Sequence, residues 1–146
     1  MNEILAKMAF DHALATHKPD FGTFFLARLL DLDISYPDEK CIIRFPIRDF
    51  LFNPQGSLHG GVIAIVLDIS MGHLLHRSFG VGGATLEMKL QYLRPLKGDM
   101  AWCQAQFLRR GRNIAFLESR LYDAQDQLVA AATSTWKVGS SNETQS

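Results

Sequence analysis

Residues 59–76 of this 146-residue chain read HGGVIAIVLDISMGHLLH, and this stretch decides the fold. Its apolar residues do not alternate with polar ones, and it is longer than a typical strand, so the pattern predicts a helix. The helix is apolar all the way round, which is typical of a helix buried on every side. A chain of this size can bury a helix so completely by wrapping a sheet around it.

The segments that follow the helix predict most of that sheet. Residues 85–93 alternate apolar and polar side chains, as a half-buried strand does. Short turns rich in Gly, Pro and Asp separate the strands that come next. Four consecutive strands joined in this way predict an antiparallel meander. The expected strands are 85–93, 101–109, 113–122 and 127–138.

The segments that precede the helix predict its remaining cover. Residues 2–16 have the apolar spacing of a short amphipathic helix. We expect strands over 23–35 and 41–47 and a loop over 49–57. The whole pattern predicts one α+β domain over residues 1–138, followed by a flexible tail over 139–146.

Charge and cysteine content limit the possible partners and the compartment. The chain carries 15 basic and 15 acidic side chains, which argues against a nucleic-acid partner. Cys41 and Cys103 lie in apolar, strand-like runs and are expected to be reduced, buried thiols. The longest apolar run, 62–67, is too short to span a bilayer, and the N-terminus does not resemble a signal peptide. We therefore expect a cytoplasmic protein without a membrane partner.

An aspartate in the middle of the apolar helix is unusual. Asp68 lies between Leu67 and Ile69. Aspartate is almost never fully buried unless it is paired, because an isolated buried charge is costly. Two interpretations remain open: Asp68 accepts hydrogen bonds from a loop or from Ser70, or it has a chemical use.

The start of the helix is the second unusual feature. Residues 56–61, GSLHGG, place two glycines where a helix exposes unpaired N–H groups and a partial positive charge. Because glycine has no side chain, a ligand can approach the backbone closely and use these N–H groups as an oxyanion hole. The alternative, also open, is that Ser57 or His59 merely caps the helix and the glycines serve the turn.

These motifs together resemble a known family. The sequence NPQGSLHGG at 53–61, Asp68 in its apolar helix and TLEMKLQYLRP at 85–95 are similar to the hotdog-fold acyl-CoA thioesterases, in particular their PaaI-like branch. The resemblance spans residues 21–138. It implies a hotdog fold, in which an antiparallel sheet wraps around one long central helix. It also implies hydrolysis of an acyl- or aryl-CoA thioester, with no cofactor because CoA is part of the substrate.

The resemblance implies roles for individual residues. Gly60 would polarise the thioester carbonyl through its N–H, and Asp68 would act as general base or nucleophile. Asn53 and His59 would orient the substrate, and Thr85 would position the attacking water. The residues expected to bind the substrate are Gly61, Tyr92, Arg94, Pro95, Lys97, Arg109, Gly111 and Arg112.

Helix geometry adds a prediction about assembly. Asp68 comes eight residues after Gly60, which is roughly 12 Å along a helix axis. A general base must lie within about 3 Å of its proton or one water away. The two groups can serve one carbonyl if they come from different subunits across a two-fold axis. We expect a homodimer at least, and the resemblance extends this to a homotetramer.

Other patterns carry less information. His73 and His76 are three residues apart but lack further ligands at suitable spacing, so we predict no metal site and expect both to be partly exposed near the helix end. Two rival functions remain, a hotdog enoyl-CoA hydratase and a non-catalytic acyl-CoA-binding or sensing protein. Several residues could line an acyl pocket or simply fill the core: Phe24, Phe25, Phe50, Phe52, Met71 and Leu75.

Overall fold

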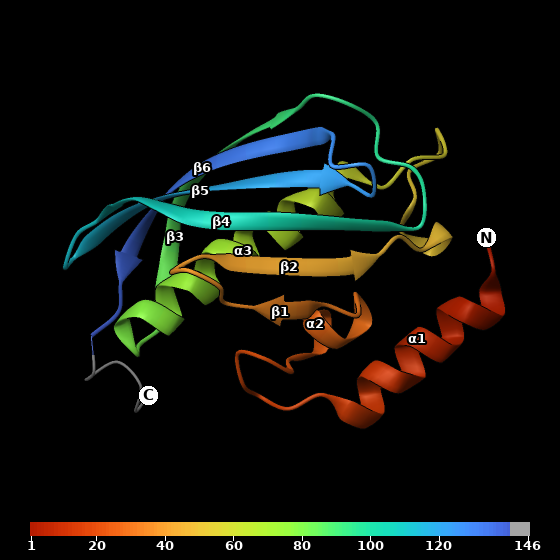
Figure 1. Cartoon of the computed structure of the whole chain (residues 1–146). Coiled ribbons are helices and arrows are strands. Elements are labelled where there is room, and N and C mark those ends of the chain that lie inside the picture. Colours follow the sequence, from red (N-terminus) through yellow and green to blue (C-terminus); the bar gives the residue numbers. More distant parts are fainter. Residues whose placement is uncertain (141–146) are drawn as a thin grey trace.

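The computed structural model describes residues 1–140, and the rest of the predicted tail lies outside the described part (Figure 1). Two helices open the chain, a long helix crosses the middle, and strands make up most of the remainder. The elements are α1 (Glu3–Thr16), α2 (Phe25–Leu29), β1 (Asp33–Ser35), β2 (Cys41–Pro46), η1 (Asp49–Leu51), α3 (Gly60–Phe79), β3 (Gly83–Tyr92), β4 (Met100–Arg110), β5 (Ile114–Asp123) and β6 (Leu128–Val138).

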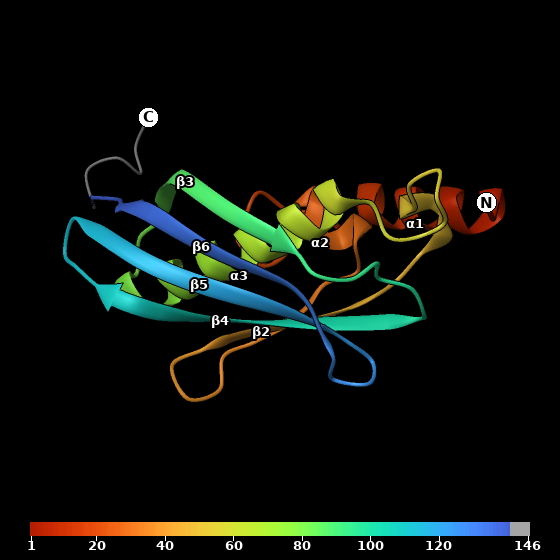
Figure 2. The ribbon, with the colours of Figure 1, turned by 90° about the horizontal axis from the view of Figure 1, so that it is seen from above.

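The central helix α3 forms as predicted and has a defined signal at each end. The His59 side chain caps the N-terminus by accepting a hydrogen bond from the Gly61 N–H. The helix ends at Phe79, three residues beyond the predicted end region at His76, and Gly80 caps it in the left-handed conformation, with φ 71°. The helix lies against one face of the curved sheet (Figures 1 and 2).

The six-stranded sheet is antiparallel throughout, in the order β1-β2-β4-β5-β6-β3. Strands β4, β5 and β6 form the predicted meander, but β3 does not join it. Instead, β3 pairs with β6 at one edge, and β4 crosses over to pair with β2. The prediction of a four-strand meander was wrong here because alternation identifies a strand without indicating its neighbours. Residues 93–99 form a crossing connection and not a tight turn.

The expected strand over 23–35 is also wrong for most of its length. Its first part forms the short helix α2, and only the last three residues form a strand, β1. Ala27 and Leu30, three residues apart, are buried together, which is a helical spacing. Asp31, with φ 54°, then turns the chain into β1.

The core lies between α3 and the sheet. Val66, Leu67, Met71 and Leu74 on the inner side of α3 are at most 1% exposed. Burying each such side chain stabilises the folded state by about 1.5–3 kcal/mol. These side chains therefore hold the helix against the sheet. Cys41 and Cys103 are both free and buried, as predicted.

The helix is not buried on every side, contrary to the prediction. Ile65 is 36% exposed and Asp68 is half-buried, because the single curved sheet covers one side of the helix and leaves an open face. The whole helix α3 is long and apolar enough to cross a membrane, judged by length and composition alone. The apolar run 62–67, which the sequence singled out, is too short to do so. Core helices of globular proteins share these properties, and 44% of its apolar window is buried in the fold.

Candidate active site

The first turn of α3 presents an unpaired backbone donor. His59 Nδ1 accepts the Gly61 N–H at 2.9 Å, so the ring proton of the neutral side chain lies on Nε2. No group within residues 1–140 accepts the Gly60 N–H. The Tyr92 hydroxyl donates to the Gly60 carbonyl at 2.7 Å, and a Cβ on Gly60 would lie 3.1 Å from the Tyr92 ring. A side chain at position 60 would crowd the Tyr92 ring, and the glycine leaves its amide free for a ligand.

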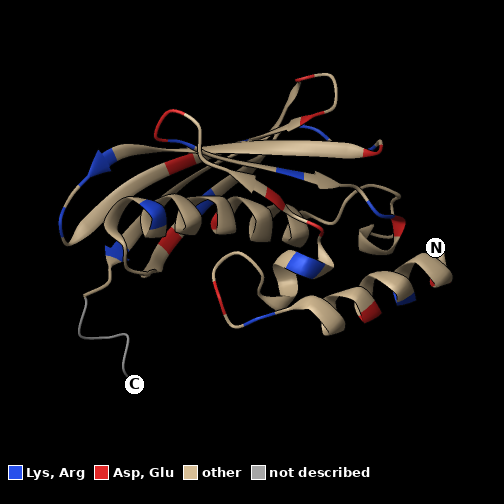
Figure 3. Cartoon of the chain, turned by 60° about the horizontal axis from the view of Figure 1, so that its bottom comes forward, with Lys and Arg blue, Asp and Glu red and all other residues tan. Residues whose placement is uncertain are grey.

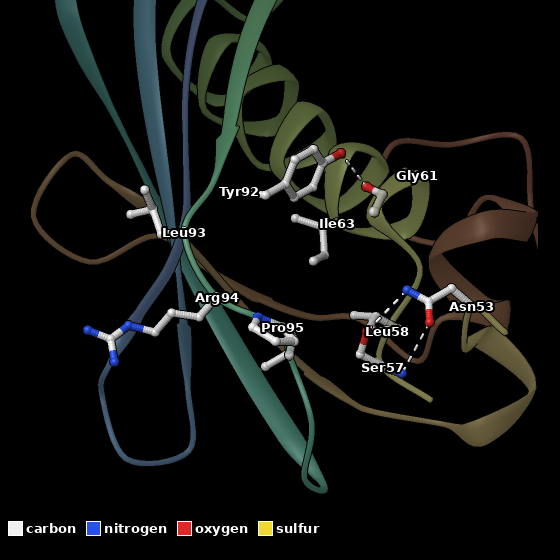
Figure 4. Close-up of a pocket in the computed structure, with 11 residues that line it drawn as sticks. Asn53, Ser57, Leu58, Gly61, Ile63, Tyr92, Leu93, Arg94 and Pro95 are labelled. Atoms are coloured by element: carbon white, nitrogen blue, oxygen red, sulfur yellow. Dashed lines mark hydrogen bonds between the residues drawn. The ribbon is translucent and has the colours of Figure 1, made fainter. Parts of the chain in front are cut away.

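The loop before α3 is held by Asn53. Its Oδ1 accepts the backbone N–H groups of Gln55 at 3.0 Å and Ser57 at 3.3 Å, and its Nδ2 donates to Ser57 Oγ at 3.1 Å. Asn53 thus fixes the loop that leads to Gly60. These hydrogen bonds, which Figure 4 shows in part, engage the side chain in the loop itself.

A pocket of about 410 Å³ opens at this end of the helix. It brings together six residues predicted to act on the substrate. Arg94 also donates to Gln127 at 3.1 Å, and its guanidinium points away from Gly61 (Figure 4). Lys97 is not among the lining residues, whereas Ser57, which sequence reasoning missed, is. The predicted residues that line the pocket are Asn53, Gly60, Gly61, Tyr92, Arg94 and Pro95.

Asp68 lies on the open face of α3 and pairs with Thr85. The Thr85 hydroxyl donates to Asp68 Oδ1 at 2.8 Å, while Oδ2 has no partner within residues 1–140. The Ser70 hydroxyl bonds the Leu67 carbonyl and Ser119, and so it is not the partner of Asp68. Asp68 is half-buried and not fully buried in the single chain, because residues 19–24 cover this face only in part.

The predicted site residues therefore fall into separate places in one chain. Asp68 and Thr85 are outside the pocket at Gly60. Arg109 lies near the end of β4, and Gly111 and Arg112 lie in the β4–β5 turn, at the opposite end of the sheet from the start of α3 (Figures 1 and 2). Basic residues mark the end of β4 (Figure 3). Their binding role stays a prediction.

A second pocket, of about 360 Å³, adjoins Asp68. Phe24 lines it, whereas Met71 and Leu75 belong to the fully buried core. His73 also lines it and is 3% exposed, so the expectation of a partly exposed histidine was wrong. The helical spacing of Val66, Ser70 and His73 on one buried side could have indicated this.

Comparison with known protein sequences identifies the family that this chain resembles. A sequence model of the thioesterase superfamily matches residues 55–130. The medium/long-chain acyl-CoA thioesterase YigI of Escherichia coli is 30% identical over 102 residues, with 58% of this chain covered. The chain spans 64% of the length of YigI.

Two solved structures share the fold. The Bacillus halodurans protein BH2602, crystallised with CoA, has a TM-score of 0.84 and 26% identity, and the match covers 95% of this chain and 94% of that one. The E. coli PaaI protein from the phenylacetic acid degradation operon has a TM-score of 0.76 and 21% identity, covering 93% and 96%. The predicted hotdog fold is confirmed, and the chain belongs to the thioesterase superfamily.

Proposed function

We propose that this protein is an acyl-CoA thioesterase that hydrolyses an acyl- or aryl-CoA thioester to the free acid and CoA. The observation that carries the proposal is the pair of Gly60, with its free amide in a pocket, and Asp68, with one free oxygen on an open helix face. Membership of the thioesterase superfamily supports it, as do the activity named for YigI and the CoA bound to BH2602.

Gly60 supplies the electrophilic part of the proposed site. Its N–H lies at the positive end of the α3 dipole and would donate to the thioester oxygen as negative charge develops there. The donor is fixed before the substrate arrives, since Tyr92 and the His59 cap hold the first turn in place. His59 keeps its Nε2–H free to orient the substrate.

Asp68 supplies the base. Its Oδ2 takes a proton from a water molecule whose oxygen attacks the carbonyl carbon. The tetrahedral intermediate then expels the CoA sulfur, and the proton passes from Asp68 to the leaving thiolate. Direct attack by Asp68, through a mixed anhydride that water later opens, is the second route. In both routes Thr85 holds Oδ1 and so orients the free oxygen.

The proposed site is shared between two subunits. Gly60 and Asp68 of one helix are separated by roughly 12 Å along its axis, too far to act on one carbonyl. Strand β3 lies at the sheet edge beside Asp68, and an edge strand offers unpaired backbone groups to a second copy. A homodimer completes the site, and the exposed Leu108, Ile114 and Phe116 on β4 and β5 offer a further surface for a homotetramer.

The expectations about cofactor, cellular location and partners form part of the same proposal. The reaction needs no cofactor, because CoA belongs to the substrate. We place the protein in the cytoplasm, in agreement with two buried thiols that are free. No nucleic acid or membrane takes part in the proposed reaction.

Release of free CoA from aryl, short, medium and long acyl thioesters tests the proposal. Asp68→Asn is expected to lower kcat by about 10²–10⁴-fold, because it removes the base while keeping the shape of the side chain. The matched control Asp38→Asn, in an exposed turn, should leave turnover unchanged. Equal rates for Asp68→Asn and wild type would remove Asp68 from the chemistry. Consumption of enoyl-CoA without thiol release would identify a hydratase, and binding without turnover a sensor.

Mixing two inactive proteins tests the shared site. Asp68→Asn chains keep the Gly60 amide, and Gly60→Val chains keep the carboxylate, so a hybrid dimer contains one complete site. Random reassociation of equal amounts should restore about one quarter of the wild-type activity, since half of the dimers are hybrid. Reassociated hybrids without activity would contradict the shared-site arrangement.

A further inference from the structure

A short loop forms one wall of the pocket beside Asp68. We call it the Phe21 loop, residues 17–24, which joins α1 to α2. The floor of the pocket is the face of α3 from Asp68 to His73, and Trp136 of β6 lines it as well. Its volume of about 360 Å³ is at the small end of the range for ligand pockets. We call this recess the Asp68 pocket.

Hydrogen bonds within the Phe21 loop hold its backbone in one shape. The Asp20 carboxylate accepts the backbone N–H groups of Gly22 at 3.0 Å and Thr23 at 2.6 Å, and the Thr23 hydroxyl donates to the same oxygen at 2.8 Å. The Lys18 N–H donates to the Thr23 carbonyl at 2.9 Å and closes the loop. The loop therefore presents Phe21 from a fixed backbone.

The Phe21 ring packs against the second half of α3. It stacks on the His76 ring, with the centroids 3.9 Å apart and the planes 11° apart, and it meets the His73 ring edge-on at 5.9 Å. His76 lies roughly 12 Å further along the helix axis than Asp68 and is rotated from it by about 80° around the helix. The ring thus bounds the Asp68 pocket at the end that lies farther from the carboxylate.

The Phe21 ring also borders a second recess, of about 350 Å³. This recess lies beside the first residues of β3, where Gly82, Gly83 and Ala84 line it. A Cβ on Gly82 would lie 3.3 Å from the Phe21 ring, so the ring packs directly on the backbone there. Among the described residues, Phe21 is the one that lines both spaces. Its ring is therefore the partition between them.

We propose that the Asp68 pocket takes the acyl group of the substrate and that Phe21 limits the length of that group. The inference rests on the proposed thioesterase function and names its substrate class, thioesters of aryl acids and of short fatty acids up to octanoyl. A longer chain meets the ring before its end is buried. Phe21 is then a specificity-determining residue and takes no part in bond breaking.

The dependence of kcat/KM on chain length tests this assignment. Each methylene that enters an apolar pocket raises binding by about fourfold, whereas a group that is too large for a fixed wall is penalised. We would measure CoA release from butanoyl-, hexanoyl-, octanoyl-, dodecanoyl- and hexadecanoyl-CoA, each below its micelle concentration. The wild type should be fastest at octanoyl-CoA or shorter, and slower on dodecanoyl-CoA by about tenfold or more.

Shortening the side chain at position 21 should join the two recesses. Phe21→Ala is expected to raise kcat/KM for dodecanoyl-CoA by about tenfold or more and to leave butanoyl-CoA within about threefold of wild type. Phe21→Leu should give an intermediate profile. Calorimetric binding of dodecyl and butyl thioether analogues, which cannot be hydrolysed, should show the same shift without turnover.

The matched control is Phe10→Ala. Phe10 is 48% exposed and Phe21 42%, so both changes remove a partly exposed phenylalanine ring. Phe10 packs edge-on against Phe25, with the centroids 5.4 Å apart, and lines neither recess. Phe10→Ala should keep the wild-type chain-length profile, and the same shift in both variants would contradict a specific role for Phe21.

The outcomes distinguish this inference from the proposed function. CoA release that depends on Asp68, with one chain-length profile shared by wild type and Phe21→Ala, would overturn the role of Phe21 and leave the thioesterase proposal standing. A wild type that is faster on dodecanoyl-CoA than on octanoyl-CoA would overturn it as well. If no thioester released CoA, both proposals would fall. The wild type and Phe21→Leu decide even if Phe21→Ala does not fold.

Discussion

At the scale of single residues, the bond between Thr85 and Asp68 orients the proposed base. Thr85→Val keeps the size of the side chain but removes the hydroxyl that donates to Asp68 Oδ1. A hydrogen bond to a charged group contributes about 1.5–3 kcal/mol, so kcat should fall by about 10–100-fold. Thr85→Ser keeps the hydroxyl and should stay within a few-fold of wild type in steady-state CoA release. Full activity in Thr85→Val would show that the bond is not used.

The buried thiols predict how stability changes at high pH. Burial raises the pKa of Cys103 to about 11, and it raises the pKa of Cys41 as well. In the unfolded chain a thiol titrates near 8.5, so between that pH and about 11 the unfolded state loses protons that the folded state keeps. The stability contribution is complete below pH 8.5 and is lost as pH rises, by roughly 1.4 kcal/mol per pH unit for each thiol.

Urea unfolding at a series of pH values from 8 to 10 measures this effect. Cys103→Ala should unfold with a shallower pH dependence than wild type, although its stability at pH 8 is lower because a cavity is left. Identical slopes in the two proteins would show that Cys103 titrates normally in the fold.

Residues of the candidate site could be predicted from the sequence where their type was unusual for their position. Asp68 in an apolar run and glycines at a helix start are such exceptions, and both lie in candidate sites. His73 was not predicted to be buried, because a histidine near a helix end is compatible with either environment. Its hydrogen bond joins it to Tyr36, 37 residues away, and no local pattern carries that contact.

At the scale of elements, the first turn of α3 combines a structural cap with a proposed substrate contact. His59→Ala removes the cap and should lower the free energy of unfolding by about 1 kcal/mol. His59→Asn offers another capping oxygen and should recover most of this stability. If His59 also orients the substrate, both variants should lose activity in CoA release. Recovery of activity together with stability in His59→Asn would reduce the role of His59 to capping.

The sequence predicts the position of some helices and strands well, but it predicts the type or the pairing of others poorly. Alternation located β3 to β6 within a few residues, and the apolar run located α3. The pairing of β3 with β6 could not be read from the chain, because strands carry no local mark of their neighbours. The α2 segment was misjudged because its residues are nearly all apolar, which hides the difference between periods of 2 and 3.6.

At the scale of the whole molecule, the open face of α3 should be the contact with the second subunit. Ile65, 36% exposed, lies on this face one turn before Asp68. Ile65→Arg should yield a folded monomer that releases no CoA, because a charge there opposes burial in an interface and the site needs two chains. Light scattering would measure the mass and circular dichroism the fold.

A matched control places the same charge elsewhere. Met8→Arg changes a residue of α1 that is 63% exposed and should preserve both the dimer and the activity. A wild-type protein that is monomeric and active would contradict this arrangement. The rise of a helix alone led to the prediction of a second copy, which stays a prediction, whereas the open face around Ile65 became evident from the fold.

The place of β3 at the sheet edge also has a consequence during synthesis on the ribosome. Its neighbour β6 ends at Val138, so β3 leaves the exit tunnel well before any strand it can pair with. Until then β3 has no strand to pair with, although β2, β4 and β5 can already pack against the apolar inner side of α3. Closure of the molecule must wait for the last strand, and this topology makes the unfinished chain a natural client for holding chaperones.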